Sequence, residues 1–276
     1  MTCKARLKSG DLTAKITKHI QDLAEATDRA RISDAMTSFL DSCSRFHQYS
    51  YGNVLIIQMT RPDATRVAGY RQWPKFNRYV RKGEKGIGIL APLMFRVDPD
   101  DPENKSTELG GFKVVYVFDV SQTDGEPLPE PPEWKSPEKN ARLNRKLTGF
   151  AIRHNIVVLE KEQPGEVQGR SLKGTVEIDP SAGTKTLVHE IAHELLHNAD
   201  APKLHVNIRE LEAESVAYVV CKHFGLDGFS SPNYVALHGA TSELILSHLD
   251  RIRSTAAMII KAVEESKDLN ASAHPG

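Results

Sequence analysis

The sequence of 276 residues contains few cysteines and lacks a long hydrophobic run. Its cysteines, Cys3, Cys43 and Cys221, are far apart and odd in number, which argues against a disulfide framework and fits a reducing compartment. None belongs to a C-x-x-C pair, so cysteine is not expected to bind a metal. No stretch approaches the roughly 18 consecutive apolar residues of a transmembrane helix, and the N-terminus lacks the apolar core and cleavage site of a secretory signal. We therefore expect a cytoplasmic protein with no membrane partner.

An excess of charge is also lacking, because 36 basic residues balance 36 acidic ones. The balance hides an uneven distribution, since nine basic and only two acidic residues lie between Arg61 and Arg96. One segment of the chain is therefore strongly positive, and such a segment is a candidate site for a negatively charged partner.

Proline marks the clearest boundary in the chain. Five prolines lie at positions 127, 129, 131, 132 and 137, and such a stretch favours extended linker structure. We therefore predict an α+β protein of two domains, residues 1–124 and 140–276, joined by a linker at 125–139.

Hydrophobic patterns predict the elements on both sides of this linker. Before it, we expect one or two amphipathic helices in residues 12–40, a helix or a strand at 53–59, and an antiparallel strand pair formed by 86–97 and 110–120. After it, we expect helices and strands in the following order: helix 138–150, strands 155–159 and 174–178, and helices 184–198, 208–224 and 240–265.

A metal-binding motif lies in residues 184–197, where His189, Glu190 and His193 form an H-E-x-x-H pattern. Four residues turn a helix by about 400°, so the two histidines lie on one face, one turn apart. Two imidazoles can then share one ion, and Glu190 can take a proton from a water molecule without binding the metal itself. The apolar residues around the motif predict a buried helix, in which His and Glu need a partner such as a metal. We therefore predict a zinc site with Glu190 as the catalytic base.

The third zinc ligand is expected on the following helix, because catalytic zinc usually has three protein ligands and an open position. Glu210 is the preferred candidate, and Glu214, one turn later, would orient a ligating histidine through its free ring N–H. Glu212 is expected to be a solvated acidic residue and a fallback ligand. His197 is expected to lie too far along its helix to share the ion.

The sequence HEIAHELLH followed by RELEAESVAYVV resembles the IrrE/ImmA group of metallopeptidases. The resemblance implies a zincin-like metallopeptidase domain after the linker, with Glu210 at the position of the family's acidic ligand. The family often has Asn or Asp where this chain has Glu214. The strand-like segment 174–180 could offer an edge to an extended substrate, and the donor that stabilises the oxyanion stays open between Tyr218, His205 and His223.

The positive segment also contains aromatic residues. Between Gly69 and Gly86, four aromatic residues alternate with cations, a combination that binds single-stranded nucleic acid through base stacking and phosphate contacts. The alternative is a solvated basic face whose aromatic residues belong to the core. The candidate nucleic-acid-binding residues are Arg71, Trp73, Lys75, Arg78, Arg81, Lys82 and Lys85.

The segment YSYGNVLIIQMTRPDATRVAGYRQWPKFNRYVRKGEKGIGILAP resembles the N-terminal domain of ArdC-type antirestriction proteins. The resemblance covers residues 10–125 and implies a domain that binds single-stranded DNA and is joined to a metallopeptidase domain.

Together these patterns predict a single-stranded-DNA-binding zinc metalloprotease that hydrolyses DNA-associated proteins, in antirestriction or in the repair of DNA–protein crosslinks. Two alternatives stay open. One is a DNA-binding antirestriction protein with a non-proteolytic metal site, and the other is an IrrE-like protease that cleaves a transcriptional repressor.

Overall fold

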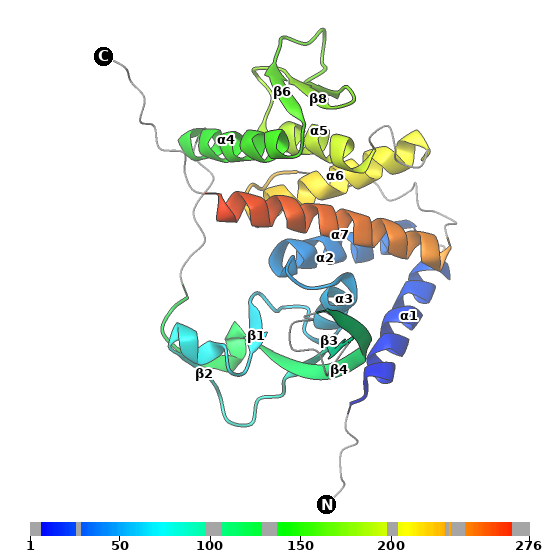
Figure 1. Cartoon of the computed structure of the whole chain (residues 1–276), viewed down its shortest axis with the longest axis vertical. Coiled ribbons are helices and arrows are strands. Elements are labelled where there is room, and N and C mark those ends of the chain that lie inside the picture. The colour runs from blue at the N-terminus through cyan, green and yellow to red at the C-terminus, as the bar shows by residue number, and fades with distance from the viewer. Residues whose placement is uncertain are drawn as a thin grey trace, which may run out of the picture. The chain divides into compact units, whose positions relative to one another are not determined.

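The structure is a computed structural model in which residues 7–25, 29–97, 106–128, 137–197, 204–229, 232 and 241–266 are described. The chain forms two compact units (Figure 1). The first contains Met1–Glu25 and Tyr49–Pro129, and the second contains Ala26–Gln48 and Glu130–Gly276. The segment Ala26–Gln48 thus differs from its predicted place in the N-terminal domain, because its helix packs in the second unit. Most of the predicted linker, residues 129–136, lies outside the described residues.

The first unit has mixed α and β structure. Its elements are α1 (Ser9–Glu25), α3 (Tyr51–Thr60), β1 (Val67–Gly69), the 3-10 turn η1 (Trp73–Phe76), β2 (Arg78–Val80), β3 (Ile87–Arg96), β4 (Thr107–Asp119), the 3-10 turn η2 (Val120–Gln122) and β5 (Thr123–Gly125). One antiparallel sheet has the order β1-β4-β3, and β2 pairs with β5 in a second antiparallel sheet. The predicted antiparallel pair is therefore confirmed as β3 and β4.

Helix α3 explains why the periodicity of residues 53–59 was ambiguous. It is buried on nearly all sides, since Val54, Leu55, Ile56 and Ile57 are all in the core. The Asn53 side chain fixes the helix to β3, because its amide donates to the Leu90 carbonyl at 2.8 Å and its oxygen accepts from the Leu90 N–H at 2.9 Å.

A buried carboxylate organises the end of β4 in this unit. Asp119 is 1% exposed, and its oxygens accept hydrogen bonds from the backbone N–H groups of Thr65, Arg66 and Ser121 at 2.8–3.1 Å. Burial alone would raise its pKa, but the hydrogen bonds from Ser121, Thr65 and Arg66 outweigh burial and lower it. Asp119 therefore joins the segment before β1 to the turn after β4.

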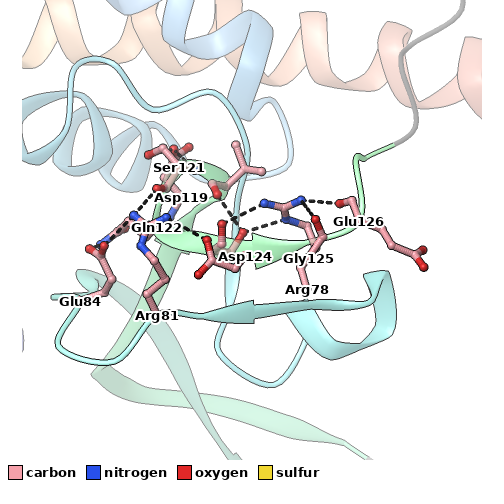
Figure 2. Close-up of polar contacts among 11 residues, drawn as sticks. Arg78, Arg81, Glu84, Asp119, Ser121, Gln122, Asp124, Gly125 and Glu126 are labelled. Atoms are coloured by element: carbon pink, nitrogen blue, oxygen red, sulfur yellow. Dashed lines mark hydrogen bonds and ion pairs between the residues drawn. The ribbon is translucent and has the colours of Figure 1, made fainter.

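The residues that follow Asp119 hold the basic segment in place (Figure 2). Gln122 donates to the Glu84 carboxylate and to the Lys85 carbonyl, both at 2.9 Å. Arg81 pairs with Glu84 at 2.8 Å and donates to the Ser121 carbonyl at 2.6 Å. The basic segment therefore lies in a network of hydrogen bonds that belongs to the fold itself.

The second unit is built from helices and one small sheet. Its elements are α2 (Arg29–Phe46), α4 (Pro137–Arg153), β6 (Val157–Glu160), β7 (Gly169–Ser171), β8 (Thr175–Ile178), α5 (Thr184–Leu196), α6 (Val206–His223) and α7 (Ser242–Glu265). Helix α6 lies between neighbours, packing against α5, α7 and α2. This position accounts for its burial, which extends from Leu211 to Cys221 with little interruption.

The sheet of the second unit corrects one prediction. Its order is β6-β8-β7, with β8 parallel to β6 and antiparallel to β7. The segment 174–180 contains the central strand β8 and cannot offer a free edge, so that prediction is wrong. The edge strand β7 was not predicted, because three residues, Gly169–Ser171, are too short to show a period of two. No helix among the described residues is long and apolar enough to cross a membrane.

Replacement of Asp119 with Asn tests its role in the first unit. We expect Asp119→Asn to lower the free energy of unfolding by about 2–4 kcal/mol, because a buried hydrogen-bonded network loses its charged acceptor. Denaturant unfolding followed by Trp73 fluorescence, in a Trp134→Phe background, measures the change. The control is Asp124→Asn, because that carboxylate is exposed; equal effects of the two changes would contradict the role.

The same carboxylate predicts the direction of an acid effect. Because the pKa of Asp119 is lowered in the folded state, its stabilisation is present above its ordinary value of 3.8 and is lost as the pH falls through the folded pKa. Part of the acid sensitivity of this unit should therefore disappear in Asp119→Asn.

Candidate metal centre

Helix α5 carries the H-E-x-x-H motif on a strongly anchored framework. Its apolar residues Leu187, Val188, Ile191 and Ala192 are buried in the second unit. The remaining stripe of the helix presents the two motif histidines to α6, against which α5 packs. The helix ends at Leu196, and the backbone N–H of the next residue, His197, donates to the His193 carbonyl.

Three side chains from α5 and α6 converge on one point. The Nε2 atoms of His189 and His193 are 3.0 Å apart, and the two carboxylate oxygens of Glu210 lie 3.4 Å from these atoms, Oε2 from that of His189 and Oε1 from that of His193. These three residues form the one cluster among the described residues that could hold a metal ion. The structure thus brings together the three residues that the sequence predicted as ligands.

The spacing of these atoms is close to the spacing of ligands around a tetrahedral metal ion. Ligands at about 2.0–2.1 Å from such an ion lie about 3.4 Å from one another. Each imidazole lies 3.4 Å from one oxygen of Glu210, whereas the two imidazole nitrogens are closer together, at 3.0 Å. The Glu210 side chain is about half exposed, whereas both imidazoles are largely buried. Two imidazoles and a carboxylate, open to solvent on one side, are the donor set of a catalytic zinc site.

The pKa shifts within the cluster also indicate a site for a cation. Burial alone would lower the pKa of His189, but its hydrogen bonds to Glu210 and Glu214 outweigh burial and raise that pKa to about 9. The hydrogen bonds from His189 and His193 hold the pKa of Glu210 well below its usual range. Without a metal the cluster stabilises positive charge, which is what a site for a cation requires.

Glu214 lies behind the ligands, at the place where the sequence predicted a supporting residue. Its carboxylate is 3.3 Å from Nδ1 of His189, so it can orient this ring through the nitrogen that faces away from Glu210. Lys185, one turn before His189, pairs with the same carboxylate. Lys185 was not predicted, because a lysine at the start of a helix carries no sequence signal of such a role.

Glu190 is buried beside the cluster. It is 8% exposed, and burial raises its pKa above the ordinary value of 4.5. A methyl group placed on Gly169 of β7 would come within 2.9 Å of the Glu190 Cγ atom and 3.0 Å of its carboxylate oxygen. Gly169 therefore allows the edge strand to pass directly against this carboxylate.

A second buried carboxylate of α5 has a structural role. Glu194 accepts hydrogen bonds from the Ser171 hydroxyl at 2.5 Å and from the Gly174 N–H at 2.6 Å. It therefore ties the motif helix to the turn between β7 and β8. The sequence analysis missed Glu194, whose position next to His193 does not distinguish it from an exposed residue.

Glu212 corrects a further prediction. It is fully buried rather than solvated, and its carboxylate lies 2.6 Å from Nδ1 of His248 and 2.9 Å from Nε of Arg251. Arg251 also donates to the Leu196 carbonyl at the end of α5. His197 lies 3.6 Å from the same carboxylate and bonds the Arg209 carbonyl, so it belongs to this network and is not grouped with the three candidate ligands.

The three candidate oxyanion donors have other partners. The Tyr218 hydroxyl donates to Asp41 at 2.8 Å, and His223 contacts the Ser44 carbonyl and Glu264. His205 caps the start of α6. The structure therefore supports none of the three as a donor at the cluster.

The candidate nucleic-acid residues fall into two groups. Trp73 is 1% exposed and packs in the core, so it offers no ring face to a base. Arg78 donates to Thr123, Gly125 and Glu126 (Figure 2), and Arg81 is held as described above. The exposed members, which make no ion pair within the described residues, are Arg71, Lys75, Lys82 and Lys85.

Comparison with known proteins finds a family that matches the N-terminal part of the chain. Residues 9–120 match the family described as the N-terminal domain of anti-restriction factor ArdC. An uncharacterized protein of Bacillus anthracis, pXO2-81, is 26% identical over 90% of this chain, which spans 51% of that protein's length.

Two solved structures of an ArdC protein are similar to this chain. The Mn(II)-bound crystal structure of antirestriction ArdC protein from the R388 plasmid has a TM-score of 0.51 at 16% identity, over 91% of this chain and 99% of that chain. Its metal-free structure has a TM-score of 0.46 at 16% identity, over 78% and 85% of the two chains. The likeness to the Mn(II)-bound structure shows that the chain has an α+β fold similar to that of this ArdC protein.

The role of Glu214 can be tested through metal affinity. We expect Glu214→Gln to weaken zinc binding about 10- to 100-fold, because residues that orient a ligating histidine have effects of this size. Competition with a chromophoric chelator measures the affinity. The matched control is Glu243→Gln, an exposed glutamate of α7; an equal loss in both variants would contradict the assignment.

Proposed function

We propose that this protein is an ArdC-type antirestriction protein, which binds single-stranded DNA through its first unit and a divalent metal ion through its second. The match of residues 9–120 to the ArdC N-terminal domain carries the proposal. Antirestriction and Mn(II) are properties of the R388 protein by its description, and here they are extended to this chain.

The charge distribution of the first unit supports binding to a polyanion. Its acidic residues near the basic segment are engaged within the unit, since Glu84 and Asp124 pair with Arg81 and Asp63 pairs with Arg61. Four cations, Arg71, Lys75, Lys82 and Lys85, are left exposed. Such an excess attracts phosphates and releases their counterions.

Zinc is the metal that the donor set of the second unit supports best. Two neutral imidazoles and one carboxylate suit Zn²⁺, although the related ArdC structure contains Mn(II). His189, His193 and Glu210 would hold the ion, and Glu214 would fix the orientation of His189. A bound Zn²⁺ would supply Lewis-acid activation of a carbonyl oxygen and of a water molecule.

Peptide-bond hydrolysis is a second candidate function, favoured by the environment of Glu190. A carboxylate with a raised pKa beside the ligands can accept a proton from an attacking water molecule and then donate it to the leaving amine. A metal site that only stabilises the fold has no need of such a group. The side of β7 that pairs with no strand among the described residues could align an extended peptide past Glu190, since Gly169 lies against that carboxylate.

The protein substrate distinguishes the proteolytic hypotheses. A protease that acts near DNA would cleave various DNA-bound proteins, in antirestriction or in the repair of DNA–protein crosslinks. An IrrE-like regulator would cleave one repressor at one preferred sequence.

Single-stranded DNA binding is tested by removing three of the exposed cations. We expect the combined change of Arg71, Lys82 and Lys85 to Gln to weaken binding to oligo(dT) and to reduce the slope of log K against log salt concentration by about 2, at roughly 0.7 per lost phosphate contact. Fluorescence anisotropy at several salt concentrations measures both quantities. A matched triple change in the second unit, Arg145, Arg153 and Arg170 to Gln, should leave the slope unchanged; equal slopes in all three proteins would contradict the site.

Proteolysis is tested with Glu190→Gln in zinc-loaded protein. We expect cleavage of a DNA-binding protein by the wild type, and a loss of at least 100-fold in the variant, because proton transfer contributes about 10²–10⁴-fold to such reactions. Zinc and DNA affinities should be unchanged. Absence of cleavage by zinc-loaded wild type, with DNA binding intact, would leave the antirestriction proposal and exclude the protease.

A further inference from the structure

An aromatic platform lies on one face of the sheet β1-β4-β3. Residues 112, 114, 116 and 118 of β4 share a face because side chains alternate along a strand. The opposite face is buried through Val117 and its partner Ile87. Tyr116 is 47% exposed on the first face, and Phe118 is half-buried next to it.

Tyr70 extends this platform from the neighbouring strand. Ala68 of β1 pairs with Phe118, and Tyr70 follows directly after the last residue of β1, Gly69, which pairs with Val117. The Tyr70 ring lies edge-on to Phe118, with centroids 6.0 Å apart, and Tyr70 is 62% exposed. The aromatic platform therefore consists of Tyr70, Tyr116 and Phe118.

Two glycines, Gly86 and Gly88, lie beside the platform. A methyl group on Gly86 would come within 2.9 Å of both Tyr116 and Phe118, so this part of the rings borders backbone. Gly88 pairs with Tyr116 across the sheet, and a methyl group there would lie 3.5 Å from the Tyr116 ring, 2.7 Å from the Leu7 side chain and 3.2 Å from the Val114 side chain. Side chains thus cover the sheet at Gly88, and a base can reach the exposed part of Tyr116.

Cations flank the platform along the chain. Arg71 follows Tyr70, and Lys85 precedes Gly86, whose backbone touches the platform. Both cations are exposed and make no ion pair within the described part of the chain. Gln122 holds the Lys85 carbonyl, which fixes the backbone at this point.

We propose that unpaired DNA bases stack on Tyr70 and Tyr116, with Arg71 and Lys85 contacting the adjacent phosphates. This inference rests on the proposed single-stranded DNA binding and names the surface that performs it. Exposed rings between cations suit an unpaired strand, because each free base offers a π-face while the phosphates require positive charge. Duplex bases are already stacked on one another, so double-stranded DNA cannot use the rings in this way.

Tyr79 is an exposed tyrosine of the first unit that lies outside this platform. Tyr79 is as exposed as Tyr70, at 62%, but it lies on β2 in the other sheet, opposite Asp124. Tyr79 thus faces a carboxylate across its strand pair. It is a matched control of the same residue type, exposure and unit.

The test measures binding of fluorescein-labelled oligo(dT) to the full chain by anisotropy. We expect Tyr70→Leu and Tyr116→Leu each to weaken binding roughly 5- to 150-fold, the range for loss of one stacked base. The salt dependence should be unchanged, because no phosphate contact is lost. Tyr79→Leu should bind as wild type, and Tyr116→Phe should keep most of the affinity because it keeps the ring.

Separate outcomes distinguish this inference from the proposed function. If the wild type does not bind oligo(dT), the proposed function itself fails. If the wild type binds and both platform variants bind equally well, only the platform is wrong. Equal losses in Tyr79→Leu, or a full loss in Tyr116→Phe with circular dichroism unchanged, would also overturn the platform, as would tighter binding to duplex than to oligo(dT).

Discussion

The packing of α5 against α6 is the constraint on which the candidate metal centre depends. It places two imidazoles from one helix and a carboxylate from the other within 3.4 Å of one another. In water such a cluster would not form by itself, because a carboxylate and two imidazoles lose solvation when they are brought together. The buried network of Glu212 with His248 and Arg251 joins α6 to α7 and to the end of α5, and so opposes separation of the two helices.

In the first unit, hydrogen bonds hold the basic segment in a defined conformation. Asp119 and Gln122 accept and donate hydrogen bonds to three separate stretches of backbone, and Glu84 neutralises Arg81 locally. Part of the positive charge is therefore used to stabilise the fold. The remaining exposed cations and the aromatic platform are available for a ligand.

The proximity of the three candidate ligands could be expected from the sequence, because helical spacing determines it. A pair of histidines four residues apart must share a helix face, and the next helix then has few carboxylates that can reach them. The prediction that Glu212 is solvated was wrong, because the burial of a glutamate depends on residues such as His248 and Arg251 that are distant in the sequence. The same limit applies to the basic segment. Composition alone cannot separate cations that bind a ligand from cations that bind their own backbone, such as Arg78 and Arg81. It also cannot separate an exposed aromatic residue from a buried one such as Trp73. The edge strand β7 was too short for any periodic signal, and α2 was assigned to the wrong unit because its packing partner α6 is far along the chain.

The account holds that one chain combines a site for single-stranded DNA with a site for one divalent metal ion. Native mass spectrometry of the full chain, incubated with zinc and a short oligo(dT) at low ionic strength, tests both parts at once. The account predicts a complex of one chain, one zinc ion and one oligonucleotide, from which a chelator removes the metal and higher salt removes the DNA. A chain that retains neither zinc nor oligonucleotide under these conditions would contradict it.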